Sequence, residues 1–265
     1  MQILLITSPI LEPITLDEAK LHLRVELTDH EEDDLIDDYI KTARLDVEND
    51  SRRQIMTATW DYYLKKWPSS DRIKLPFGKL QTVSYIKWKD DDGTETNLTK
   101  TLTAFADLDV SSGTKTKVTS AAHGFADGDL VFISGTTSYN GAWTISNIET
   151  NTFDITTAFV ADDATGTAST DYIVELNGDQ CGFVVLPYGE TWPSGTLYPS
   201  NPITIRFVCG WTTRALVPAT VKSAVKMRCG KLYKSRGDDF IGQTVIEDKT
   251  YARLVNNIPR LYDEF

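Results

Sequence analysis

The chain has 265 residues, a formal net charge of −11, 41% apolar residues and 25% charged residues, which is an ordinary globular composition with length for one or two domains. The excess of acid argues against a protein that grips nucleic acid over its whole surface. No apolar run approaches the roughly 18 residues of a membrane helix, and the opening MQILLITSPILEPIT lacks the basic first region of a signal peptide. The cysteines, Cys181, Cys209 and Cys229, are odd in number and widely spaced, so we expect reduced thiols in a cytoplasmic setting.

Two helices are predicted near the start of the chain. Thr15 with Glu18, and Thr28 with Glu31, fit the capping box, in which each side chain satisfies a backbone donor of the first helical turn. The first helix is short. The second is predicted over residues 29–49, where apolar residues recur at helical spacing: Leu35, Ile36, Tyr39, Ile40, Ala43 and Val47.

The second predicted helix opens on a dense acidic cluster. Seven of ten successive residues are carboxylates: Asp29, Glu31, Glu32, Asp33, Asp34, Asp37 and Asp38. They flank the apolar stripe and occupy the first helical turns, where the helix dipole favours negative charge, so we interpret most of them as solvated surface. The alternative is a cation site on Asp33 and Asp37, which lie four residues apart on one helix face.

Period-two alternation then predicts strands, and Asp90-Asp91-Asp92-Gly93 reads as a hairpin turn between two of them. A calcium loop is the weaker interpretation of these aspartates, because Glu95 stands where such a loop needs glycine. A stretch rich in Thr, Ser, Gly and Asp follows, with alternating apolar residues at Val131, Ile133, Trp143, Ile145, Ile148, Phe153 and Ile155. We therefore expect an α+β body with N-terminal helices, an antiparallel sheet and a C-terminal helix, and an inserted all-β domain, a small barrel or sandwich.

The predicted domain boundaries follow from these changes in sequence pattern and composition. The body comprises residues 1–105 and 171–237, the inserted β-domain residues 106–170, and a C-terminal tail residues 238–265. A late helix begins near Pro218 and ends near Gly237. Between Arg214 and Arg236 the chain has 7 bases and no acid, whereas between Asp17 and Asp50 it has 13 acids and 4 bases. The two regions could contact each other within a subunit, contact each other between neighbours, or be independently solvated faces.

No enzyme motif is present. The chain has no P-loop, no G-x-G-x-x-G and no G-x-S-x-G, and no C-x-x-C exists. His22, His30 and His123 are too dispersed to indicate a zinc site. We expect no enzymatic activity and no cofactor.

Six segments in order resemble the head–tail connector family of tailed phages, the adaptors beneath the portal. The N-terminal segments are ITLDEAKLHLR, the acidic helix, and a strand ending at Trp67-Pro68 that is followed by IKLP and VSYI. The later segments are GFVVLPYGETWP, ITIRFVCGW and VPATVKSAVKMRCGKLYKSRG. The inserted β-domain departs from the usual connector and resembles small β modules of phage structural proteins.

The resemblance implies a virion structural protein of the neck, assembled in the host cytoplasm, with no membrane partner. It would form a ring of about twelve subunits by head-to-tail contacts. The ring would lie beneath the portal and above a tail-side stopper or tail-completion protein. Double-stranded DNA would pass through its channel without sequence-specific binding. Two charged faces are the expected ring contacts: Asp33, Asp34, Asp37 and Asp38 on one, and Lys222, Lys226, Arg228 and Lys231 on the other. The apolar tail residues are the expected portal-docking set, with packing on their own body as the alternative: Tyr251, Leu254, Ile258, Tyr262 and Phe265.

Two other functions stay open on the sequence alone. A tail-side or head-decoration protein would use the β-domain to bind capsid or host surface. A metal-dependent nuclease would use Asp33 or Asp37 and would show cation-dependent activity.

Overall fold

The computed structural model describes residues 2–108, 114–234 and 249–258, and the chain divides into two compact units. The helical unit comprises Thr7–Ala58, Pro76–Lys79 and Cys209–Phe265. The sheet unit comprises Met1–Ile6, Thr59–Leu75 and Leu80–Val208. Helices together with antiparallel strand pairs confirm the predicted α+β class. No helix in the described part of the chain is both long and apolar enough to cross a membrane.

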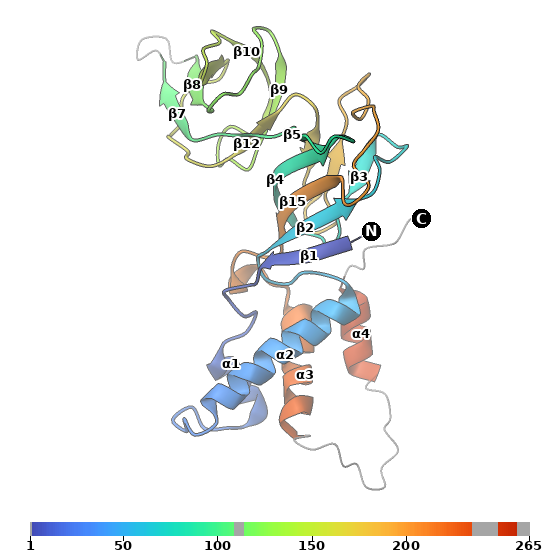
Figure 1. Cartoon of the computed structure of the whole chain (residues 1–265). Coiled ribbons are helices and arrows are strands. Elements are labelled where there is room, and N and C mark those ends of the chain that lie inside the picture. Colours follow the sequence, from blue (N-terminus) through green and yellow to red (C-terminus); the bar gives the residue numbers. More distant parts are fainter. Residues whose placement is uncertain (1, 109–113, 235–248, 259–265) are drawn as a thin grey trace. The chain divides into compact units, whose positions relative to one another are not determined.

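The helical unit is built around a long helix and the late helix of the chain. Its elements are α1 (Leu16–Leu23), α2 (Asp33–Ser51), the 3-10 turn η1 (Arg214–Leu216), α3 (Ala219–Lys234) and α4 (Lys249–Asn257). The four α-helices are labelled in Figure 1. Helices α2 and α3 pack together and run antiparallel, because Asp46 bonds Arg228 while Glu32 bonds Tyr233. Their facing apolar side chains form the core of the unit: Ile36, Ile40, Ala43 and Val47 from α2, and Val221, Ala224, Val225 and Cys229 from α3.

The two predicted capping boxes have different outcomes. Thr15 Oγ1 accepts from the Glu18 amide at 3.1 Å, and Glu18 Oε2 accepts from the Thr15 amide at 3.2 Å, which confirms the first box. The second is wrong, because α2 begins at Asp33 rather than residue 29 and its N-cap, Glu32, makes no capping side-chain bond. The Nζ of Lys20 on α1 donates to the Asp29 carbonyl at 2.5 Å and also pairs with Asp33, so this segment is held as a loop between the helices.

The main sheet of the second unit has the strand order β1-β2-β15-β4-β5. The strands are β1 (Gln2–Thr7), β2 (Ala58–Leu64), β15 (Ile203–Cys209), β4 (Leu80–Lys89) and β5 (Glu95–Asn97). Alternate residues of β15 are buried, as expected for a strand with one face on a core. The predicted hairpin between β4 and β5 is confirmed: the Gly93 amide donates to the Asp90 carbonyl at 3.0 Å, and Gly93 has φ +83°.

The serine- and threonine-rich stretch forms its own sheet around its own core. The strand order is β6-β12-β9-β10-β11-β8-β7. The strands are β6 (Lys100–Thr101), β7 (Ala104–Asp107), β8 (Thr116–Thr119), β9 (Leu130–Ser134), β10 (Gly141–Ser146), β11 (Thr152–Ile155) and β12 (Thr167–Ser169). The two outer strands, β6 and β7, are separated only by Leu102 and Thr103, whose amides donate to the Gly166 and Thr119 carbonyls, so the sheet closes on itself. We call this closed sheet the barrel.

The barrel core contains the residues that the period-two pattern indicated. Val131, Ile133, Ile145, Phe153 and Ile155 are buried, while Trp143 and Ile148 pack against them partly exposed. A third small sheet has the order β13-β14-β3, with β13 (Ile173–Glu175), β14 (Phe183–Val185) and β3 (Arg72–Lys74). The division into a discontinuous body, an inserted domain of residues 106–170 and a tail stays a prediction.

Candidate assembly interface

The acidic end of α2 is divided between one structural carboxylate and several free ones. Asp33 is half-buried and pairs with Lys20, whose side chain is 1% exposed, and with His30 Nδ1 at 2.7 Å. The hydrogen bond from Lys20, followed by that from His30, lowers the pKa of Asp33. Asp33 therefore joins α2 to α1, and its removal would disturb the helical unit itself.

The neighbouring acids project into solvent. Asp34, Asp37 and Asp38 are exposed, and the carboxylate of Asp38 pairs with Lys41, at 3.1 Å on the surface of the same helix. Within the described residues, no three His, Cys, Asp or Glu side chains are grouped so as to hold a metal ion. The cation pairing considered for Asp33 and Asp37 also competes with the ammonium of Lys20. Asp34, Asp37 and Asp38, which we call the acidic face, are thus available for contacts outside the subunit.

The basic residues of α3 are also divided. Arg228 Nε bonds Asp46 Oδ2 at 2.5 Å, and Lys226 approaches Glu18 at 3.8 Å. Lys222 and Lys231 have no ion-pair partner among the residues that the structure describes. The acidic and basic regions of the sequence therefore meet within one subunit through Asp46 and Arg228, while Lys222 and Lys231 stay open to a neighbour.

A histidine belongs to the basic surface. The pKa of His22 on α1 is lowered, first by burial and then by the positive charges of Lys226 and Lys234. The α1–α3 contact is close here, because a Cβ added to Gly230 would lie 3.4 Å from His22 Nε2. His22 therefore lies at the α1–α3 contact, beside the basic residues of α3.

The predicted docking tail packs, as far as it is described, on its own unit. Tyr251 Oη donates to Asp50 Oδ2 at 2.7 Å, and burial, then this bond, raises the pKa of Tyr251. Ile258 is 1% exposed and lies in the helical core, with Leu254 packed against that core. Tyr262 and Phe265 lie outside the described residues. Portal docking by these five residues stays a prediction, and it would require α4 to present a different surface or to leave the core.

One functional-looking cluster was missed from the sequence. Arg44 is 6% exposed and donates to Glu12 Oε2 at 2.8 Å and to Glu48 Oε2 at 2.7 Å. Glu48 also accepts from the Ile55 amide at 2.9 Å, and burial raises the pKa of Glu48 to about 7. The i, i+4 spacing of Arg44 and Glu48 was a visible signal, but the distant Glu12 was not. The cluster ties the chain before α1 to the chain after α2, so its role is structural.

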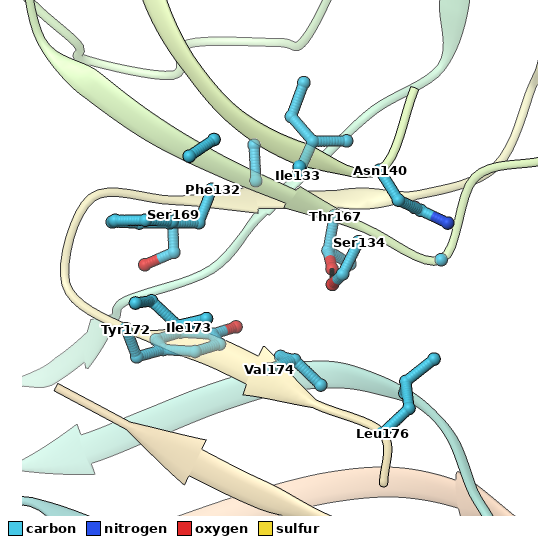
Figure 2. Close-up of a pocket in the computed structure, with 14 residues that line it drawn as sticks. Phe132, Ile133, Ser134, Asn140, Thr167, Ser169, Tyr172, Ile173, Val174 and Leu176 are labelled. Carbon is cyan, nitrogen blue, oxygen red and sulfur yellow. Dashed lines mark hydrogen bonds between the residues drawn. The ribbon is translucent and has the colours of Figure 1, made fainter. Parts of the chain in front are cut away.

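A pocket of about 500 Å³ lies in the sheet unit, beside the barrel. Figure 2 shows its walls, which come from β9, the start of β10 and β12 on one side and from Tyr172 to Leu176 on the other. Phe132, Ile133, Val174 and Leu176 give it an apolar lining. No pattern in the sequence indicated it, because its walls come from segments that fold into different sheets.

Comparison with known proteins found one protein family and several solved structures that are similar to this chain. A model of the phage gp6-like head–tail connector protein family matches residues 13–101. No curated protein matches the chain. A chain from the neck of an empty GTA particle, computed with C6 symmetry, has a TM-score of 0.58 and 15% identity, over 98% of this chain and 96% of that chain. A chain from the virion of the native gene transfer agent has a TM-score of 0.54 at 16% identity, and one from the native GTA neck, computed with C12 symmetry, 0.54 at 14%, with the same coverage.

The structural matches also cover residues 106–170, the stretch that departs from the usual connector. Because 98% of this chain is aligned, the structural likeness includes the barrel as well as the body. The identities are low, so the likeness establishes the fold alone. The resemblance drawn from the sequence is confirmed by the match of residues 13–101 to the model of the phage gp6-like head–tail connector protein family.

Proposed function

We propose that the chain is a structural protein of a virion neck, which forms a ring beneath the portal, joins the capsid to the tail and extends the DNA channel. The observation that carries the proposal is the agreement of the connector family model over residues 13–101 with a fold shared over nearly the whole chain with proteins from particle necks. Related particles computed with C6 and C12 symmetry support a ring of identical subunits.

The charges of the chain support this role. A closed ring needs two different, complementary faces on each subunit. The acidic face, Asp34, Asp37 and Asp38, and the cations Lys222 and Lys231 are exposed or partly exposed charges that no strong contact with the described residues uses. The net charge of −11 also suits a channel through which DNA slides, because phosphates that are not neutralised release no counterions and are not held.

The test is co-sedimentation of the purified chain with portal rings of its own phage, followed by negative-stain images of the pellet. A second ring stacked on the portal is the expected result. A chain that stays in the supernatant at tens of micromolar refutes the portal role, and shells then replace portals as bait for the capsid-decoration alternative.

A charge variant tests the acidic face in the same assay. Asp34→Asn, Asp37→Asn and Asp38→Asn together should lower the pelleted fraction about tenfold, which corresponds to about 1.4 kcal/mol of lost attraction. Asp33 is left intact because it holds α1 to α2. The matched control removes three exposed acids of the sheet unit, Asp91, Asp92 and Asp127. Equal binding by both variants removes the acidic face from the ring contact.

A further inference from the structure

Strand β1 has the sequence of a central strand but the position of an edge strand. Its residues, QILLIT, are apolar on both faces, since Ile3 and Leu5 alternate with Leu4 and Ile6. Strands of this composition are usually buried on both faces. Here Leu4, Leu5 and Ile6 are 48%, 39% and 39% exposed, and among the described residues the strand pairs with β2 alone.

The opposite edge of the same sheet shows how an edge is normally protected. Strand β5 is short and polar, and its Glu95 is paired with Lys87 at 2.8 Å. Short, charged edges prevent another chain from adding to the sheet. Strand β1 carries neither a charge nor a proline, and the first ionisable side chain of the sequence is Glu12. Within the part of the chain that the structure describes, the β1 edge is therefore open to an added strand.

The pocket of Figure 2 has the matching properties. None of the residues that line it carries a charge. One wall is β13, an edge strand that pairs, as far as the chain is described, with β14 alone, and the rim of the pocket includes Leu176, which is 43% exposed. An apolar edge strand beside an apolar pocket can accept a strand whose side chains are apolar.

The two surfaces lie on opposite sides of the sheet unit. The barrel strand β12, which lines the pocket, contacts β4, and Thr167 Oγ1 donates to the Val83 carbonyl at 3.4 Å. In the sheet order β1-β2-β15-β4, β1 is three strands away from β4, or about 14 Å. A protruding apolar strand and an apolar pocket on opposite sides form a head-to-tail pair, which repeats from copy to copy.

We propose that β1 of one copy docks beside β13 of the next copy, with the Leu5 side chain in the pocket of that copy. The occupant is a second copy of this chain because one chain carries both matching surfaces, an uncharged apolar strand edge and an uncharged apolar pocket, so that identical copies can pair head to tail. The contact rests on the proposed ring and adds to it an interface outside the charged helices.

Crosslinking on the assembled particle tests the contact. Leu5→Cys and Leu176→Cys are placed in one chain, bound to portal rings, pelleted and treated with a short bis-maleimide. The native cysteines are 4% exposed or less, so the parent chain measures the background of crosslinking through native cysteines. We expect a ladder of covalent multimers from the double variant and none from either single variant. A double variant of Leu130→Cys and Leu176→Cys is the control, because Leu130 is 49% exposed on the barrel outside the pocket.

Charge variants give an independent reading. Leu5→Asp should lower the pelleted fraction at least tenfold, Leu5→Asp with Leu176→Lys should recover it, and Leu130→Asp should leave it unchanged. Circular dichroism checks that each variant is folded. If Leu5→Asp does not fold, the crosslinking experiment alone tests the β1 contact.

The outcomes separate the two proposals. If parent rings stack on portals but the double-cysteine variant yields no ladder, the β1 contact is wrong and the proposed function stands. A crosslink from Leu5→Cys to the portal protein instead of a second copy also overturns the contact. If the parent chain forms no ring on portals, the proposed function is wrong and the contact fails with it.

Discussion

The buried Glu48 makes the stability of the helical unit depend on pH. Burial raises the pKa of Glu48 from an ordinary value of 4.5 to about 7, although Arg44 and the Ile55 amide favour its charged form. A carboxyl whose pKa is raised on folding stabilises the fold below its unfolded pKa, and this contribution is lost as the pH rises through its folded pKa. The stability contributed by Glu48 should therefore decline between about pH 4.5 and pH 7.

The size of the effect follows from the shift. A difference of 2.5 pKa units between 4.5 and 7 corresponds to at most about 3 kcal/mol of unfolding free energy, at about 1.36 kcal/mol per unit. Glu48→Gln mimics the neutral acid, and Arg44 keeps its partner Glu12, at 2.8 Å, so the variant leaves no buried cation unpaired. The variant should exceed the stability of the parent by about 1 kcal/mol near pH 5 and by about 3 kcal/mol at pH 8.

Urea unfolding at pH 5, 6, 7 and 8, followed by circular dichroism, measures this difference for the parent, for Glu48→Gln and for the control Glu31→Gln. Glu31 is exposed, so its variant should run parallel to the parent at every pH. A difference between Glu48→Gln and the parent that does not change with pH would refute the reasoning. It would mean that the guanidinium and the backbone donor keep Glu48 ionised throughout this range.

Two further predictions concern single positions. Tyr139→Phe should destabilise the barrel by about 2 kcal/mol in thermal unfolding. The reason is that Tyr139 Oη donates to the Ala161 carbonyl at 2.7 Å and accepts from the Val160 amide at 2.9 Å. An unchanged Tm would show that water replaces the hydroxyl. Gly210→Ala should yield little soluble protein on expression, since φ is +105° and the added Cβ would lie 2.5 Å from the Met56 carbonyl oxygen; normal yield and Tm would contradict this.

Local patterns in the sequence were sufficient for the elements that depend on neighbouring residues. The capping box at Thr15 and Glu18, the hairpin turn at Gly93 and the buried alternation of the barrel strands all involve groups within a few residues of one another. The start of α2 was wrong because a residue of another helix, Lys20, holds the Asp29 carbonyl. Helix propensity and the spacing of capping residues do not predict that contact, because they depend only on neighbouring residues.

The candidate interface needed the tertiary structure, because availability for a partner depends on what the rest of the chain has already used. Acidic and basic helices were evident from composition, but only packing shows that Arg228 is used by Asp46 and Asp33 by Lys20, whereas Asp34 and Lys231 stay exposed. The apolar run of β1 was likewise visible as letters. Its position at an open sheet edge, with an uncharged pocket on the other side of the unit, results from strand order. Strand order joins residues far apart in sequence, and local physical chemistry does not determine it.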